Sequence, residues 1–257
     1  MEGYRDVMTR NSLIEIQKAT VVYRKYPSLT NSLKLELLQP RKSRLKSTSV
    51  SALKQISLEI GPGEVVGVIG RNGAGKSTLA KLIVGAVRPV SGWVVTRGSI
   101  SSMIELTAGI NTDMSPRENV RLNCAIQQLP LDDIQNRAIR ICKNAGVQDL
   151  LDIPIRSFSS GMLARFAFSL YTDVSPDILI IDEILSVGDL GFQSYSQNVI
   201  KGLIDAGRCV VLISHDLDSI LQHSSRVIWL ENGTVRQDGL PKNVISEYRK
   251  NSMASGE

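Results

Sequence analysis

Gly70-Arg71-Asn72-Gly73-Ala74-Gly75-Lys76-Ser77-Thr78 is the stretch that decides how this chain folds. It matches Gly-x4-Gly-Lys-Ser/Thr, a phosphate-binding loop, in which glycines allow successive backbone N–H groups to point at phosphate oxygens. Lys76 can then reach the β- and γ-phosphates, and the hydroxyl of Ser77 can ligate Mg²⁺. The candidate binding residues in this loop are Gly70, Asn72, Gly73, Gly75, Lys76, Ser77 and Thr78.

The residues on both sides of the loop separate this interpretation from a glycine-rich turn that binds nothing. Residues 64–69 form a short apolar run typical of a buried strand, and residues 77–87 repeat apolar side chains at helical spacing. A loop at such a strand-to-helix turn also gains the partial positive charge of the helix N-terminus. The sequence therefore predicts that the chain binds a nucleoside triphosphate.

Composition gives broad limits. The 257 residues carry 30 basic and 25 acidic side chains, and a net charge of +5 is too small to indicate nucleic acid. Three widely spaced cysteines, Cys124, Cys142 and Cys209, form neither a disulfide framework nor a metal site and are expected to be reduced and buried. No apolar run approaches the ~20 residues that cross a bilayer. The polar N-terminus is not a signal peptide, so we expect a soluble, intracellular chain.

A basic insertion interrupts the pattern near the N-terminus. Residues 13–16 and 19–23 predict a first strand, and a half-buried strand resumes at Ala52. Between them, residues 24–51 form the insertion, and residues 24–46 hold seven Lys/Arg and one Glu. Composition alone favours a solvated loop here.

The middle of the chain is predicted to be helical. Ser115, Pro116 and Glu118 form a capping box with proline at the first helical position. A second helix is expected over residues 132–145, with Gly146 as its stop. After it, apolar strands alternate with helices, and Asn232-Gly233 marks a hairpin. A last helix from Pro241 should end near residue 249, leaving residues 250–257 as a flexible tail.

Two further patterns accompany the phosphate loop. Asp182 and Glu183 end an apolar strand, where Asp182 could hold Mg²⁺ opposite Ser77 and Glu183 could activate water. A strand-end salt bridge is the alternative for Glu183. Ser159 and Gly161 open a helix and could face a γ-phosphate, although an ordinary serine N-cap explains the same residues.

The order of these features matters: phosphate loop, helical segment, Ser-Gly helix start, aspartate strand, then a strand ending in His215. In this order the chain resembles the ATP-binding subunit of ABC transporters over residues 13–249. Ser159 and Gly161 fall in a variant of the family signature Leu-Ser-Gly-Gly-Gln. The resemblance places Asp189 in the D-loop and His215 at the switch that contacts the γ-phosphate. Tyr23 is the candidate for stacking on adenine, with a plain strand aromatic or Tyr26 as alternatives.

The resemblance implies an α/β P-loop NTPase fold with a RecA-like core, an antiparallel β subdomain and a helical subdomain inserted at about residues 111–172. It also implies ATP hydrolysis with Mg²⁺, held by Ser77 and Asp182, and with Glu183 and His215 as catalytic residues. The working unit would be a head-to-tail dimer. Each ATP would then lie between Lys76 and Ser77 of one copy and Ser159 and Gly161 of the other.

Departures from the common family pattern point to a subfamily. Residues 104–110 lack the glutamine that usually precedes the helical subdomain, and the basic insertion is long. Together these features are similar to exporters of lipid-linked polysaccharides such as O-antigen, capsule and teichoic acid. That similarity implies a transmembrane permease partner, a lipid-linked polysaccharide at the membrane, a peripheral position on the cytoplasmic face of the inner membrane, and no nucleic acid. Export of a drug or small lipid, and a non-transport ATPase acting on nucleic acid or ribosomes, remain alternatives.

In such exporters the insertion is expected to face the membrane subunit. Its basic cluster suits anionic groups, either the inner leaflet surface or the pyrophosphate of a lipid-linked polymer. The cluster comprises Arg41, Lys42, Arg44 and Lys46.

Overall fold

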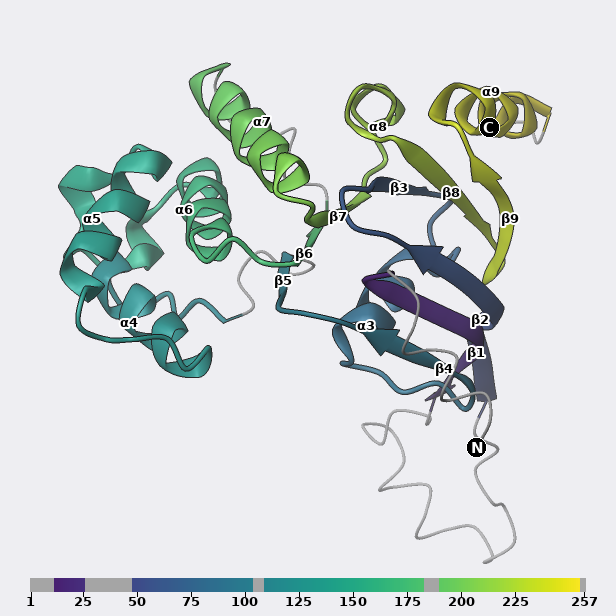
Figure 1. Cartoon of the computed structure of the whole chain (residues 1–257), viewed down its shortest axis with the longest axis horizontal. Coiled ribbons are helices and arrows are strands. Elements are labelled where there is room, and N and C mark those ends of the chain that lie inside the picture. The colour runs from purple at the N-terminus through teal and green to yellow at the C-terminus, as the bar shows by residue number, and fades with distance from the viewer. Residues whose placement is uncertain (1–11, 26–47, 104–108, 183–189, 255–257) are drawn as a thin grey trace, which may run out of the picture.

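The computed structural model describes residues 12–25, 48–103, 109–182 and 190–254 (Figure 1). A six-stranded sheet in the order β5-β6-β7-β3-β8-β9 forms its centre. Neighbouring strands are parallel from β5 to β8, and β9 is antiparallel to β8. The bounds are β3 Val65–Ile69, β5 Ile100–Met103, β6 Ile178–Asp182, β7 Cys209–Ile213, β8 Arg226–Glu231 and β9 Thr234–Gly239.

Helices cover both faces of this sheet, which explains why its central strands are continuous apolar runs. Along β3, Val65 and Ile69 belong to the core under α8 (Leu217–His223) and α9 (Pro241–Ala254). Val66 and Val68 point the other way, into the core shared with α3 (Lys76–Val84). Because parallel strands end at one edge, the segments that follow β3, β6 and β7 are brought together there.

A second, three-stranded antiparallel sheet has the order β2-β1-β4 and lies on the α3 side (Figure 1). Its strands are β1 Ile14–Lys25, β2 Thr48–Ile60 and β4 Ser91–Thr96. Arg24 and Lys25 pair with Ser49 and Thr48, so both ends of the expected insertion at 24–51 are strand. The predicted loop is therefore wrong at both ends of the insertion. Strand pairing depends on backbone hydrogen bonds, which basic and small polar residues make as well as apolar ones. The basic cluster at 41–46 lies outside the described residues.

The helical subdomain stands at one end of the molecule, farthest from β9 (Figure 1). It contains α4 (Pro116–Ile126), α5 (Ile134–Ala145) and α6 (Ser160–Thr172), with short 3₁₀ turns η3 (Gln148–Leu150) and η4 (Ile155–Ser157). The predicted capping box is confirmed: the amide of Ser115 donates to Glu118 Oε2 at 2.8 Å, and Ser115 Oγ accepts from the Glu118 amide. Gly146 ends α5 in the left-handed conformation, as expected.

The C-terminal helix is longer than expected. It was predicted to end near residue 249, but α9 continues to Ala254, so most of the predicted flexible tail is helical. Tyr248 packs edge-on against Trp229 of β8, with ring centroids 5.3 Å apart. Ser252 Oγ also donates to the carbonyl of Tyr248 at 3.0 Å. The ring contact is tertiary and the bond of Ser252 is local to α9, and both favour a helix end that the polar sequence alone does not predict. Helix α7 (Leu190–Asp205) follows the undescribed residues 183–189.

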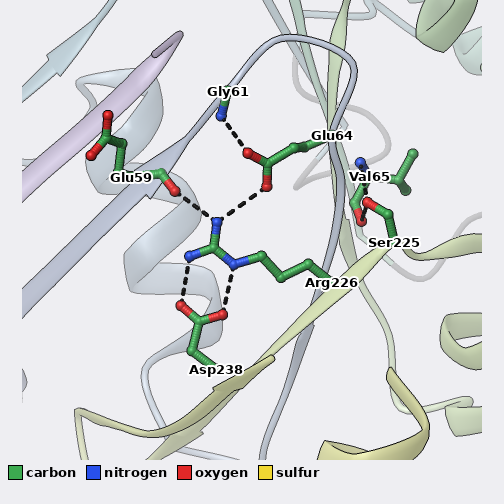
Figure 2. A network of polar contacts seen from close by, with 7 residues as sticks. All are labelled: Glu59, Gly61, Glu64, Val65, Ser225, Arg226 and Asp238. Atoms are coloured by element: carbon green, nitrogen blue, oxygen red, sulfur yellow. Dashed lines mark hydrogen bonds and ion pairs between the residues drawn. The ribbon is translucent and has the colours of Figure 1, made fainter. Parts of the chain in front are cut away.

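Arg226 at the start of β8 joins the two sheets (Figure 2). Its guanidinium donates two hydrogen bonds of 2.7 Å to the carboxylate of Asp238 on β9. It also donates to Glu64 Oε2 at 3.1 Å and to the carbonyl of Glu59, on β2, at 2.9 Å. Glu64 Oε1 in turn accepts from the amide of Gly61 at 2.8 Å. The free edge of β2 is therefore tied to the β8–β9 hairpin.

Within the ranges that the structure describes, no helix has the length and apolar character needed to traverse a bilayer.

Candidate nucleotide-binding site

The glycine-rich loop lies between β3 and α3, as the sequence predicts. Two of its glycines have neighbours that leave no room for a side chain. A Cβ on Gly70 would lie 2.3 Å from the carbonyl oxygen of Leu230, and a Cβ on Gly75 would lie 2.8 Å from that of Ala52. Gly75 also caps α3 with φ 109°, a conformation that glycine adopts without steric cost. The loop thus packs closely against β8 on one side and β2 on the other.

Lys76 is held inside this loop. Its side chain is buried, and Nζ donates to the carbonyls of Gly70 at 2.6 Å and Arg71 at 3.2 Å. Loop carbonyls that accept from the ammonium are turned inward, so the ammonium is placed within the curve of the loop. The loop residue Ser77 is exposed, whereas Thr78 is half-buried.

A cleft of about 470 Å³ opens beside the loop and brings together residues from four parts of the chain. Tyr23 comes from β1, and His215 follows the end of β7. The cleft therefore unites the predicted aromatic, the loop and the predicted switch histidine. Its lining consists of Tyr23, Val50, Ser51, Ala52, Asn72, Gly73, Gly75, Lys76, Ser77, Thr78 and His215.

The far wall of the cleft presents an apolar pair. Tyr23 and Val50 are register partners across β1 and β2, so their side chains share one face of the sheet. They are 39% and 43% exposed, which leaves an aromatic ring and an aliphatic side chain open to the cleft. Val50 was missed by sequence reasoning because it was counted within the basic insertion. No residue pattern around it separates a strand from that insertion.

The strand that carries Asp182 lies beside the strand that leads to His215. Asp182 is the last residue of β6 and is the register partner of Ile213 on β7, so the two strand ends are level. His215 is followed by Asp216, whose side chain accepts from the amides of Asp218 and Ser219 and caps α8. The other predicted residues of this region, Glu183 and Asp189, lie outside the described residues.

Ser159 and Gly161 are placed on the helical subdomain. Ser159 Oγ accepts from the amide of Met162 at 3.2 Å, so the N-cap interpretation is correct for this side chain. A Cβ on Gly161 would meet no other heavy atom within 4 Å, so the helix start presents an open surface there. Neither residue lines the cleft described above. In this one chain the structure does not bring them to the phosphate loop.

The three cysteines are buried and free, as the sequence indicates. Burial raises the pKa of the Cys142 thiol to about 11 and that of Cys209 to about 12. Such thiols stay protonated near neutral pH and are poor nucleophiles and metal ligands. No group of His, Cys, Asp and Glu in the described part of the chain has the arrangement of a metal-binding cluster.

Comparison with known proteins agrees with this geometry. The family model described as "ABC transporter" matches residues 53–186. The O-antigen export system ATP-binding protein RfbB of Klebsiella pneumoniae is 36% identical over 240 residues, covering 93% of this chain and 98% of that protein. The teichoic acids export ATP-binding protein TagH of Lactococcus lactis is 40% identical over 228 residues, covering 84% of this chain and 49% of that protein.

Solved structures share the fold. An ATP-binding subunit of an ABC transporter superposes with a TM-score of 0.73 at 19% identity, covering 92% of this chain and 93% of the other. The dimeric ATP-binding cassette MJ0796, bound to ADP and Pi in a post-hydrolysis state, gives 0.71 at 21% identity, with 89% and 98% covered. These similarities confirm the expected α/β fold with its antiparallel β and helical subdomains.

Proposed function

The chain belongs to the ABC transporter family, and from that membership we propose that it is the ATP-binding, ATP-hydrolysing subunit that powers export of a lipid-linked polysaccharide. The observation that carries the proposal is the similarity to an O-antigen export ATP-binding protein along nearly the whole of both chains. A teichoic acid export protein matches as well, so the shared substrate class is a polymer on a lipid carrier.

The cleft supports a defined orientation for ATP. The adenine lies against Tyr23 and Val50, where an aromatic face and an aliphatic side chain are open. The triphosphate lies in the loop, where backbone N–H groups, the helix N-terminus and Lys76 provide positive charge. ATP therefore contacts two walls of the cleft, one from the three-stranded sheet and one from the loop.

The residues present fit Mg²⁺ in their donor chemistry. Ser77 is exposed at the cleft, and Asp182 is the last residue of β6. A hydroxyl and a carboxylate are oxygen donors of the kind Mg²⁺ prefers. When bound, the ion neutralises charge on the β- and γ-phosphates. His215 then contacts the γ-phosphate from the end of β7, and Glu183 orients and deprotonates the attacking water.

Ser159 and Gly161 act on the nucleotide of a second copy. They lie apart from the cleft of their own chain, on an open helix start, which suits a contact made in trans across a head-to-tail dimer. Closure and reopening of the dimer drive a separate transmembrane permease at the cytoplasmic face of the inner membrane. In this proposal the basic insertion at residues 24–51, whose basic cluster lies outside the described residues, serves the interaction with that permease or with the anionic lipid carrier.

Affinity purification from detergent-solubilised membranes tests this proposal. The tagged chain is expected to recover a polytopic membrane protein. Deletion of the gene that encodes the chain should leave lipid-linked polymer inside the cell. Complementation by the wild-type chain should restore surface polymer, whereas complementation by Lys76→Ala should not. Recovery of ribosomes, or normal surface polymer with altered drug efflux, would contradict polysaccharide export and support one of the alternatives.

A further inference from the structure

The turn of the β8–β9 hairpin touches both walls of the nucleotide cleft. The amide of Gly233 donates to the carbonyl of Ala74, in the phosphate loop, at 3.1 Å. The carbonyl of Gly233 accepts from the amide of Lys54, on β2, at 2.7 Å. One residue of the turn is thus hydrogen-bonded to the loop on one side and, on the other, to the strand that carries Val50 and Ala52.

The hydrogen bond between Gly233 and Lys54 forms at the free edge of the three-stranded sheet. β2 is an edge strand of the three-stranded sheet, and Lys54 falls in its register irregularity between Leu53 and Ile56, where no partner on β1 is in register. Its amide is directed to the hairpin instead. Farther along β2, Arg226 binds the carbonyl of Glu59 (Figure 2). The hairpin therefore holds β2 at two points, and the one nearer the cleft is Gly233.

The contact between Gly233 and β2 leaves no room for a side chain on Gly233. A Cβ on Gly233 would lie 2.7 Å from the carbonyl oxygen of Ala52, 3.1 Å from its carbonyl carbon and 3.4 Å from the Cα of Leu53. All three atoms belong to the backbone of β2, so no side-chain rotation relieves the overlap. Gly233 also has φ +81° within the Asn-Gly turn. A larger residue must push β2 away from the loop.

We propose that Gly233 is a positioning residue that sets the spacing between β2 and the phosphate loop, and through it the affinity for ATP. The inference rests on the proposed function, in which the adenine lies against β2 and the triphosphate lies in the loop. A ligand that bridges two walls binds well only when their separation matches its own length. The hydrogen bonds of Gly233 hold that separation, together with the close packing of Gly75 against Ala52.

Gly233→Ala tests this role in the purified full chain. The added Cβ displaces Ala52, and with it Val50, while the loop keeps its own hydrogen bonds. Because this displacement weakens binding of the ground state and of the transition state equally, KM should rise with kcat unchanged. We expect KM and Kd for ATP to rise about tenfold, which corresponds to about 1.4 kcal/mol of binding free energy. kcat at saturating ATP should stay within about twofold.

Gly207→Ala is the matched control. Gly207 also has a left-handed backbone, with φ +72°, but a Cβ there would meet no heavy atom within 4 Å. It lies between α7 and β7, away from the cleft lining. Both variants carry the backbone strain of alanine at positive φ, and Gly233→Ala adds the overlap with β2, so Gly233→Ala should be the less stable of the two without nucleotide. Only Gly233→Ala should lose ATP affinity.

Several outcomes would overturn the proposal. They are an unchanged KM for Gly233→Ala, a kcat that falls with KM unchanged, and equal affinity losses in both glycine variants. Failure of the wild-type chain to bind ATP would instead refute the proposed function. If Gly233→Ala does not fold, Gly233→Asn adds the same Cβ with less backbone strain, because asparagine tolerates the left-handed region. Its KM must then rise, or the proposal fails.

Discussion

The side-chain nitrogen of Lys76 lies 2.6 Å from the carbonyl oxygen of Gly70, six residues earlier in the chain. A second hydrogen bond of 3.2 Å joins it to the carbonyl of Arg71. Because the side chain is only 7% exposed, these bonds hold a nearly buried positive charge at the place where the loop curves. These hydrogen bonds therefore place a positive charge inside the loop, where it can attract phosphate oxygens.

Lys76→Ala should remove most of the affinity for ATP. Charge-assisted hydrogen bonds are each worth about 1.5–3 kcal/mol, so we expect a loss of about tenfold to a hundredfold. Isothermal titration with ATP measures this loss, and circular dichroism checks that the fold is retained. Lys143→Ala, on the exposed surface of α5, removes the same charge far from the loop and should bind ATP normally. Wild-type affinity in Lys76→Ala would show that the loop amides suffice.

Glu183→Gln should separate binding from hydrolysis. The amide cannot accept a proton from water, so turnover should fall by about 10² or more, whereas Lys76 and Ser77 still hold the nucleotide. ATP should then trap a stable dimer, visible by light scattering coupled to size-exclusion chromatography. Asp182→Asn is the contrasting variant, because loss of a magnesium ligand should weaken Mg²⁺-dependent binding itself. Substantial phosphate release by Glu183→Gln would assign water activation to another residue.

Gly161→Asp should act across the dimer. A side chain at Gly161 meets nothing within 4 Å in its own chain, so the monomer should fold and bind ATP normally. In the proposed head-to-tail dimer the added carboxylate would face the partner's γ-phosphate, so ATP-dependent dimerisation and hydrolysis should both fail. Gly202→Asp, at an equally open position on α7, is the control and should keep both. Equal loss of monomer affinity and dimerisation in Gly161→Asp would mean a structural role alone.

Features that depend on residues close together in the chain could be predicted from the sequence. The turn from β3 through the glycine-rich loop into α3, the capping box of Ser115 and Glu118, and the Asn232-Gly233 turn each depend on residues close together in the chain. The structure contains all three. The family resemblance implied nucleotide contacts for Tyr23 and His215, and both residues line the cleft beside the loop. Residues close together in the chain are enough to predict the loop, the capping box and the turn.

The remainder depends on contacts between distant segments. The spacing role inferred for Gly233 needs Ala52 opposite its missing Cβ, and no sequence pattern relates these two positions. The last turns of α9 depend on Tyr248 meeting Trp229. Val50 lines the cleft because the pairing of β1 with β2 continues into the basic insertion. In each case tertiary packing overrides the local signal.

Glu118→Ala should destabilise the chain in a pH-dependent way. Hydrogen bonds from the amide and then the hydroxyl of Ser115 lower the pKa of Glu118. A carboxylate with a lowered pKa in the folded state stabilises that state above its unfolded pKa of about 4.3, and this stabilisation is lost as pH falls through the folded value. The variant should therefore unfold at lower urea than wild type at pH 7, and the gap should narrow toward pH 3.

Asp113→Ala is the control for this comparison. Asp113 pairs with Arg156 at 3.4 Å, and both side chains are largely exposed, so the loss should be small at either pH. Urea midpoints at pH 7 and pH 3 distinguish the two sites. If Glu118→Ala lowers the urea midpoint by the same amount at pH 7 and at pH 3, the charge of Glu118 does not contribute to the cap.

Arg226→Met should loosen the junction between the two sheets. The guanidinium is half-buried and binds Asp238, Glu64 and the carbonyl of Glu59 (Figure 2). Its paired hydrogen bonds to Asp238 raise the pKa of Arg226 above its ordinary value, so pH does not discharge it and a substitution is required. Methionine keeps the aliphatic length but removes the guanidinium from Asp238 and from Glu64, which retains its bond from the amide of Gly61.

We expect the free energy of unfolding to fall by about 2 kcal/mol, the range of hydrogen bonds to charged groups. Arg249→Met is the matched control, because Arg249 pairs with Asp218 at 2.6 Å but on an exposed surface, where such pairs contribute about 1 kcal/mol or less. Urea unfolding of both variants at neutral pH measures the difference. A loss in Arg226→Met no larger than in Arg249→Met would mean that the β8–β9 hairpin is held to β2 by its backbone contacts, with Gly233 as the main link.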